Sequence, residues 1–294
     1  MIENRAVLVL GAGASKPYGL PLGSELRDEV LRASTDLDLR ARLGGNYDSQ
    51  LQDFCASLAQ SGFSSVDAFL EQRPEWTDIG KSAMALCLLA AERQAKDKLF
   101  PPHQPKDHWY EVLWSCLRAP SWSAFKRQPL TVVTFNYDRS LEHYLARVLT
   151  NNYSIKPETA RAALPVLHVH GTLGEYDGTF GQLVDKASYN LASRSIRVVH
   201  EADVRHSDFV RARTLIVAAE RVLCVGFGYH DANMRKLGFG TTRRLRTDPP
   251  KILGTHKGIK AHAWQRLCNT YYFSPVAAKQ GAGSISEFVA EWLV

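Results

Sequence analysis

Short apolar runs, separated by long helical stretches, are the feature that most constrains how this chain can fold. Each run is rich in valine and leucine and is followed by a glycine or a polar residue; the runs cover residues 5–10, 130–135, 166–170 and 221–225. Strands buried on both faces have this continuous apolar pattern, because helices cover the two sides of a parallel sheet. The alternation therefore predicts an α/β fold, a Rossmann-like parallel sheet with helices on both faces.

Local patterns predict further elements. Ser24 precedes a segment with acidic residues in its first turn, which predicts the N-cap of a helix over 25–31. A further strand is expected at 261–264 or at 271–273. The remaining expectations are a helix over 139–150, a hairpin or flap over 171–190, the end of a helix at 214–219 and a terminal helix over 285–293.

The segment 36–128 has a different pattern from the rest of the chain. Its apolar residues recur at helical spacing, as at Leu51, Phe54 and Leu58, and strand patterns are absent from its sequence. We expect a helical insertion module there, with helices over 79–99 and 109–117. The prediction is a single domain over 1–294, in which 1–35 and 129–294 form the Rossmann-like part.

Composition narrows the class of protein. Apolar residues make up 45% and charged residues 22% of the chain, as in ordinary globular proteins. No apolar run reaches the roughly 18 residues that span a bilayer, and the first residues lack the order of a signal peptide. A cytoplasmic location without membrane contact is expected. The five cysteines include no CxxC pair, so a zinc ribbon is excluded and no metal site is expected.

The net charge of +6 is concentrated in residues 235–260, which contain eight basic residues and one acidic residue. Such a stretch can attract the phosphates of a nucleic acid or of a nucleotide. A solvated basic face, or a surface for an acidic partner chain, is the alternative interpretation.

Four glycine-rich or polar segments lie at or just after the predicted strands. An open parallel sheet binds its ligand in the crevice beyond the carboxyl ends of the strands, so together the segments predict one nucleotide site. They are Gly11–Ser15, Thr134–Asp138, His168–Gly171 and Gly226–Asn233.

The first segment supplies Gly11, Ala12, Gly13 and Ser15. Glycines after a first strand allow a tight turn and a close approach to a pyrophosphate, and a following helix presents free N–H groups. The GxGxxG pattern is incomplete, because Lys16 occupies its last position, and a plain tight turn is the alternative.

The middle segments supply candidate catalytic residues. The carboxamide of Asn136 can hold a hydroxyl and a water, because it both donates and accepts hydrogen bonds; an Asx turn with Asp138 as a helix N-cap is the alternative. His168 and His170 are two residues apart and would share a face of a strand. His170 is the better candidate for a general base, although a buried core histidine is the usual case.

The last segment repeats the pattern of a strand followed by glycines, here Gly226 and Gly228. Asp231 and Asn233 follow, and their side chains suit either the hydroxyls of a ribose or the cap of the next helix.

The order of these motifs resembles the sirtuin superfamily, specifically the bacterial sirtuin-like NAD hydrolases of antiphage defence systems. The motifs are Gly-Ala-Gly-x-Ser at 11–15, Thr-x-Asn-x-Asp at 134–138, His-Gly at 170–171 and Gly-x-Gly-x-x-Asp-x-Asn at 226–233. Residues up to about 35 and from about 129 to 240 carry the resemblance.

This chain departs from the deacylating sirtuins in two places. Their Gly-Ile-Pro-Asp-Phe-Arg loop is replaced at 19–23 by Gly-Leu-Pro-Leu-Gly, which lacks the Asp and the Arg. Only Cys224 and Cys268 follow His170, and two cysteines cannot build the four-cysteine zinc module of those enzymes. Both departures disfavour deacylase chemistry.

The resemblance implies hydrolysis of NAD to nicotinamide and ADP-ribose, with NAD as substrate and no metal. Asn136 would position the nicotinamide ribose and the attacking water, His170 would be the general base, and Asp138 would support the loop. The turn at 11–15 would lie by the pyrophosphate.

Two other classes of function stay open: a protein deacylase or ADP-ribosyltransferase, and a non-catalytic nucleotide-sensing subunit that contacts nucleic acid through 235–260. An unregulated NAD hydrolase would be toxic to its own cell. We therefore expect a homo-oligomer, or a partner such as a helicase, nuclease or sensor protein, to gate the activity.

Overall fold

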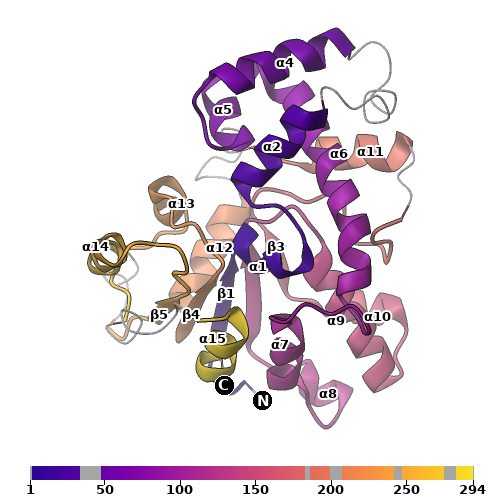
Figure 1. Ribbon diagram of the computed structural model, residues 1–294. Coiled ribbons are helices and arrows are strands. Elements are labelled where there is room, and N and C mark those ends of the chain that lie inside the picture. The colour runs from indigo at the N-terminus through magenta and orange to yellow at the C-terminus, as the bar shows by residue number, and fades with distance from the viewer. Residues whose placement is uncertain are drawn as a thin grey trace.

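Five parallel strands form one sheet surrounded by helices in the computed structural model of this chain (Figure 1). The structure describes residues 2–33, 48–182, 186–198, 207–241, 247–274 and 283–293. The strands are β1 (Ala6–Leu10), β2 (Leu130–Thr134), β3 (Val166–His168), β4 (Arg221–Val225) and β5 (Lys251–Gly254).

The sheet order is β3-β2-β1-β4-β5. The chain therefore builds outward from β1 to β3 on one side and then returns to add β4 and β5 on the other side. This is the strand order of a Rossmann-like sheet, in which the ligand crevice lies where the order reverses, between β1 and β4. The predicted fold class is confirmed.

The register of the strands brings their carboxyl ends level with one another. Leu10 pairs with Thr134 of β2 and with Val225 of β4, and Thr134 pairs in turn with His168 of β3. All four segments singled out in the sequence therefore lie at the same edge of the sheet.

Helices make up most of the remaining described structure. Before β2 these are α1 (Ala12–Ser15), η1 (Lys16–Tyr18), α2 (Gly23–Ala33), α4 (Asp48–Gln60), α5 (Val66–Gln72), η3 (Pro74–Trp76), α6 (Thr77–Ala95), η4 (Lys96–Lys98), α7 (Trp109–Leu117) and α8 (Trp122–Phe125). After β2 they are α9 (Ser140–Tyr153), α10 (Pro157–Ala162), α11 (Lys186–Ser195), α12 (Ser207–Ala218), α13 (Asp231–Lys236), α14 (Ala261–Tyr271) and α15 (Ile285–Trp292).

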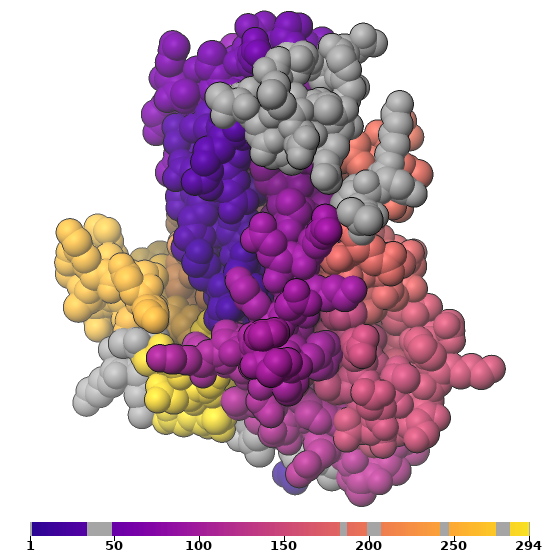
Figure 2. Space-filling view, turned by 45° about the vertical axis from the view of Figure 1, so that its right-hand side comes forward, coloured from indigo at the N-terminus to yellow at the C-terminus, as the bar shows by residue number. Residues whose placement is uncertain are grey.

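Two hydrophobic cores hold these elements together. The larger core contains the sheet with α7, α9, α12, α14 and α15. The second core is built from α2, α4, α5, α6 and α11, and these elements form the upper part of the molecule in Figures 1 and 2. We call this second group the helical module. It includes α2 and α11, which lie outside 36–128, and the predicted domain boundaries stay a prediction.

The fifth strand was wrongly placed by the sequence patterns. It is β5 at Lys251–Gly254, whereas both expected segments belong to α14 or to its end. Trp264, Cys268 and Tyr271 are buried at helical spacing on one face of α14. Tyr272 ends the helix in the left-handed conformation, with φ 58°, which a strand cannot contain.

Three local expectations also change. Ser24 is the second residue of α2, which begins at Gly23, so it is not the N-cap. At this helix start the Glu25 carboxylate accepts a hydrogen bond from the backbone N–H of Leu22. Strand β3 ends at His168, so His170 lies in the following turn and shares no strand face with it. Part of the expected hairpin or flap is α11, while 183–185 lie outside the described residues.

Other expectations are confirmed. Helices lie at the segments predicted over 25–31, 79–99, 109–117, 139–150, 214–219 and 285–293. None of the helices in the described ranges combines the length and the apolar character needed to cross a bilayer. All five cysteines lie in the described part of the chain, and all are buried thiols.

The C-terminal helix α15 is attached to the body of the fold by Asp107. The Asp107 carboxylate accepts hydrogen bonds from the backbone N–H groups of Ile285 (3.1 Å) and Ser286 (3.0 Å). Ser284 and Glu287 complete the helix start with a reciprocal capping box. Every N–H of the first turn therefore has an acceptor, and one acceptor comes from 178 residues away.

We predict that Asp107→Ala lowers the free energy of unfolding by about 1–2 kcal/mol, the usual effect of removing a helix cap. Asp107→Asn should lose less, because its amide oxygen can still accept a hydrogen bond. Urea unfolding of the two variants measures the difference. Equal losses would show that the carboxylate acts by charge and not as an acceptor.

Candidate functional site

The turns that follow β1 and β4 touch through their backbones. The N–H of Gly13 donates to the carbonyl of Gly226 at 2.9 Å, and the N–H of Gly11 donates to the carbonyl of Val225 at 3.1 Å. A Cβ on Gly13 would lie 2.8 Å from the Cα of Gly226, and one on Gly226 would lie 2.0 Å from the backbone nitrogen of Ala14. Gly226 also has φ +57°. These glycines therefore have a packing role whatever ligand approaches them.

The helix that starts at Ala12 is only four residues long and continues as the 3-10 turn η1. The sequence suggested a helix whose N-terminal dipole faces a pyrophosphate. A single turn carries too small a dipole for that argument, so the close approach of the backbone is the property that this turn contributes.

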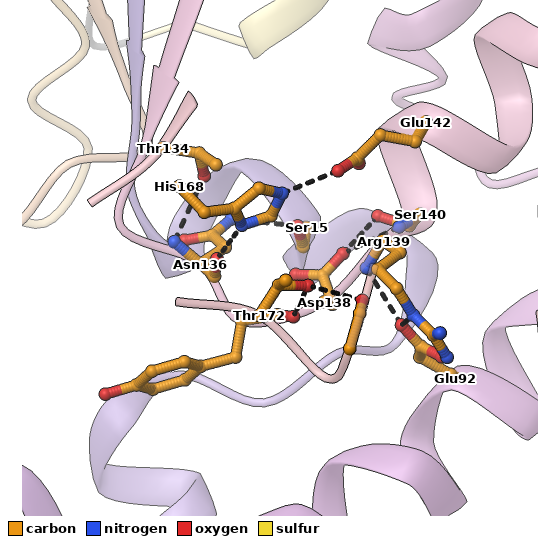
Figure 3. A network of polar contacts seen from close by, with 12 residues as sticks. Ser15, Glu92, Thr134, Asn136, Asp138, Arg139, Ser140, Glu142, His168 and Thr172 are labelled. Atoms are coloured by element: carbon orange, nitrogen blue, oxygen red, sulfur yellow. Dashed lines mark hydrogen bonds and ion pairs between the residues drawn. The ribbon is translucent and has the colours of Figure 1, made fainter. Parts of the chain in front are cut away.

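Asn136 is held in one orientation by its neighbours (Figure 3). Its Nδ2 donates to the Oγ of Ser15 at 3.0 Å, and its backbone N–H donates to the Oγ1 of Thr134 at 3.0 Å. Ser15 ends α1, which follows β1, and Thr134 ends β2, so the two contacts come from neighbouring strand ends. The Oδ1 atom of Asn136 is buried and has no hydrogen-bond partner among the described residues.

Asp138 holds the chain just after Asn136 through hydrogen bonds to Ser140. Its Oδ1 accepts hydrogen bonds from the backbone N–H of Ser140 at 3.1 Å and from the Ser140 hydroxyl. Burial raises the pKa of Asp138, and the Ser140 hydrogen bonds oppose that shift. The hydrogen bond from the Ser140 N–H to the Asp138 side chain forms an Asx turn at the start of α9. The N-cap residue of α9 is Arg139, not Asp138.

His168 has both ring nitrogens occupied by acceptors. Nδ1 lies 2.8 Å from the backbone oxygen of Asn136, and Nε2 lies 2.5 Å from a carboxylate oxygen of Glu142. A backbone oxygen and an ionised carboxylate can only accept, so this geometry favours an imidazolium with a proton on each nitrogen. Burial alone would lower the pKa of His168, but the Glu142 carboxylate outweighs it and raises the pKa. His168 therefore orders the Asn136 backbone and is no candidate base.

His170 has the opposite state. Its Nδ1 lies 3.2 Å from the backbone oxygen of Arg197, which can only accept, so Nδ1 carries the proton. The Nε2 atom keeps its lone pair and is buried without a partner in the described part of the chain. Burial lowers the pKa of His170 to about 4, with a further contribution from Lys236. At neutral pH the ring is thus a neutral acceptor.

Arg197 is a functional neighbour that the sequence analysis missed. Its backbone N–H donates to the carbonyl of His170 at 2.8 Å, and its guanidinium pairs with Asp208 at 2.6 Å. The two segments meet because Gly171 has φ +73° and forms an isolated bridge with Ile196. No sequence pattern around Arg197 predicts its contact with His170, since that contact depends on the bridge between Gly171 and Ile196.

The last segment is placed at the same edge, on the β4 side. Asp231 begins α13, and its carboxylate accepts from the Tyr271 hydroxyl and pairs with Arg235. Asn233 is half-buried in α13, and Gly228 is exposed. The structure thus already engages the Asp231 carboxylate, and it leaves open the ribose role suggested for Asp231 and Asn233.

A cavity of about 710 Å³ lies elsewhere, lined in part by Arg5, Arg213 and Glu220. Arg5 and Glu220 precede β1 and β4, so this cavity reaches the amino edge of the sheet. It is therefore separate from the carboxyl edge, where the candidate residues Asn136 and His170 lie.

The basic stretch 235–260 is only partly described. Lys236 lies over the ring of Phe209 at 5.5 Å, and Lys251 lies over Trp292 at 4.6 Å. Residues 242–246, which include three of the arginines, lie outside the described ranges. Contact with nucleic acid through this stretch stays a prediction.

No protein-family model and no curated protein matches this chain. A solved structure described as the crystal structure of a Sir2 homolog–NAD complex aligns with it at a TM-score of 0.43 and 13% sequence identity. The alignment covers 98% of this chain and 88% of that one. The class of protein, a Rossmann-like α/β fold, follows from the strand order and register of this chain.

We predict that Gly13→Ala destabilises the protein by about 1–3 kcal/mol, since the added Cβ collides with a backbone that cannot move aside easily. Gly228→Ala is the matched control, because its Cβ would meet only the His230 ring, at 3.2 Å. Urea unfolding measures both. Equal stability of the two variants would contradict the packing role of Gly13.

The low pKa of His170 predicts how stability varies with pH. The unfolded chain takes up this proton near pH 6.5 and the folded protein only near pH 4, so stability falls as the pH falls through that window. The complete loss is roughly 3 kcal/mol. His170→Gln, which cannot titrate, should lose correspondingly less between pH 7 and pH 4 than the wild type in urea titrations. Parallel pH profiles would contradict a buried neutral His170.

Proposed function

We propose that this chain hydrolyses NAD at the bond between nicotinamide and ribose, giving nicotinamide and ADP-ribose. The observation that carries the proposal is a pair of buried acceptor atoms without partners, Oδ1 of Asn136 and Nε2 of His170. Buried polar atoms are rarely left unpaired in native proteins. A bound water or ribose hydroxyl would supply the missing donors.

Both acceptors follow adjacent parallel strands, β2 and β3, at the carboxyl edge of the sheet, and β2 neighbours β1, where the strand order reverses and the crevice lies. Dinucleotides bind at such a crevice in Rossmann-like folds. The turn at 11–15 follows β1 at this crevice, and the resemblance to the sirtuin superfamily would place the pyrophosphate beside it. The motif order that resembles the sirtuin superfamily favours NAD among the dinucleotides.

The chemistry follows from the states of the two side chains. The glycosyl bond breaks with its electron pair passing to the ring nitrogen of nicotinamide, which leaves as a neutral molecule. Asn136 accepts a hydrogen bond from the water that attacks the oxocarbenium-like ribose carbon. His170 accepts the proton of that water, or of a ribose hydroxyl, and releases it to solvent. Its low pKa keeps Nε2 able to accept at neutral pH.

The biological role that we propose is the effector of a bacterial antiphage defence system, which depletes NAD when triggered. This role rests on the resemblance alone. It requires gating, by a homo-oligomer or by a partner such as a helicase, nuclease or sensor protein. The competing classes are a deacylase or ADP-ribosyltransferase and a nucleotide-sensing subunit.

We predict that the purified chain releases nicotinamide and ADP-ribose in equal amounts, and that Asn136→Ala and His170→Ala each lower kcat by about 10²–10⁴-fold. His143→Gln is the matched control, since His143 is also buried with its pKa lowered to about 4 but lies outside the site. Chromatographic quantification of both products measures the effect.

Other outcomes identify the competing functions. ADP-ribose retained on protein would indicate a transferase, and NAD binding without product release would indicate a gated enzyme or a sensing subunit. Addition of a candidate partner separates these last two. Hydrolysis that survives in both Ala variants would contradict the proposal.

A further inference from the structure

Two carboxylates of the helical module, the buried Glu92 and the half-buried Asp67, reach the loop that carries Asn136, the site loop over 135–139. We propose that Asp67 and Glu92 are positioning residues, which hold this loop so that the Asn136 carboxamide faces the reacting ribose. The consequence for catalysis rests on the proposed function, whereas the positioning itself can be tested without it.

Glu92 makes the stronger of the two contacts (Figure 3). It lies on α6 with 1% of its surface exposed. Its Oε1 accepts from the backbone N–H of Arg139 at 2.8 Å and from Arg139 Nε at 3.2 Å, and its Oε2 accepts from Nη2 at 2.7 Å. One carboxylate therefore anchors both the side chain and the backbone at the end of the site loop.

Asp67 anchors the middle of the same loop from α5. Its Oδ1 accepts from the Tyr137 hydroxyl at 2.7 Å. That hydroxyl also lies 3.5 Å from the carbonyl oxygen of Arg197, the atom that holds the Nδ1 proton of His170. The Tyr137 hydroxyl thus contacts both the helical module and the carbonyl that sets the His170 tautomer.

Alternate residues of the site loop bind different groups of partners. Tyr137 and Arg139 are bound by carboxylates of the helical module, whereas Asn136 and Asp138 are bound by Ser15 and Ser140. The site loop therefore lies between the two cores, bound to Ser15 at Asn136 and to the helical module at Tyr137 and Arg139.

The chemistry of the Glu92–Arg139 pair favours positioning over stabilisation. Burying two charges carries a large desolvation penalty, and well-packed apolar residues are often as stabilising. Burial raises the pKa of Glu92, and Arg139 opposes that shift. What the pair supplies beyond packing is fixed geometry, since a planar guanidinium and a carboxylate pair in one plane.

The test compares Glu92→Gln and Tyr137→Phe with the wild type in NAD hydrolysis. We expect kcat to fall by about 10–100-fold while KM changes by less than about 3-fold, because the transition-state geometry is lost and ground-state binding is kept. Asp67→Asn should retain near wild-type kcat, since its amide oxygen still accepts from Tyr137, and Asp67→Ala should match Tyr137→Phe. Glu71→Gln, an exposed carboxylate on the same helix, is the control.

Hydrogen exchange separates this inference from the proposed function. In Glu92→Gln and Tyr137→Phe, amides of 135–139 should exchange faster while those of 11–15 keep wild-type rates. A wild type that releases no nicotinamide even with a candidate partner added would end the proposed function and leave the hydrogen-exchange measurement intact. Unchanged exchange in the site loop, or faster exchange across the whole chain, would overturn the positioning role.

Discussion

The backbone contact between the turns after β1 and β4 is the constraint on which the carboxyl edge depends. Gly13 and Gly226 approach so closely that a Cβ on either would meet the backbone of the other turn. The contact joins the two turns at the point where the strand order reverses, and it brings the first and last of the four motifs together. The site loop and His170 then reach the same edge, because β2 and β3 continue the register of β1.

Burial makes two neighbouring histidines chemically different. His168 meets a carboxylate and a carbonyl, so it is held as a cation that orders the loop. His170 meets one carbonyl and aromatic rings, with Phe135 at 5.3 Å and Phe209 at 5.5 Å, so it is held neutral with a free lone pair. A charge-stabilised histidine and a neutral histidine with a free acceptor nitrogen are thereby placed two positions apart without competing for one proton.

Much of the fold could be predicted from sequence, because buried parallel strands have a strong local pattern. β1 is wholly apolar, and β2, β3 and β4 are mostly apolar. β5 has only two large apolar residues, Ile252 and Leu253, whereas the run around β3 continues to Val169, so the pattern of β5 is too weak to compete with the aromatic residues of α14. Asn136 and His170 could be proposed because they follow strands directly. Asp67, Glu92 and Arg197 could not, because their partners are distant in sequence and follow from the packing of separate elements.

By itself, the sequence determined the strand pattern, the glycines that permit a close turn, and the candidate polar residues at the strand ends. Each of these is a local property, set by side-chain shape and by the order of residues along the chain. Only the tertiary structure decided the protonation of each histidine, the direction of the Asn136 amide and the part that the helical module takes in the site. These properties depend on which acceptors lie within about 3 Å, and the packing of the two cores brings those acceptors into place.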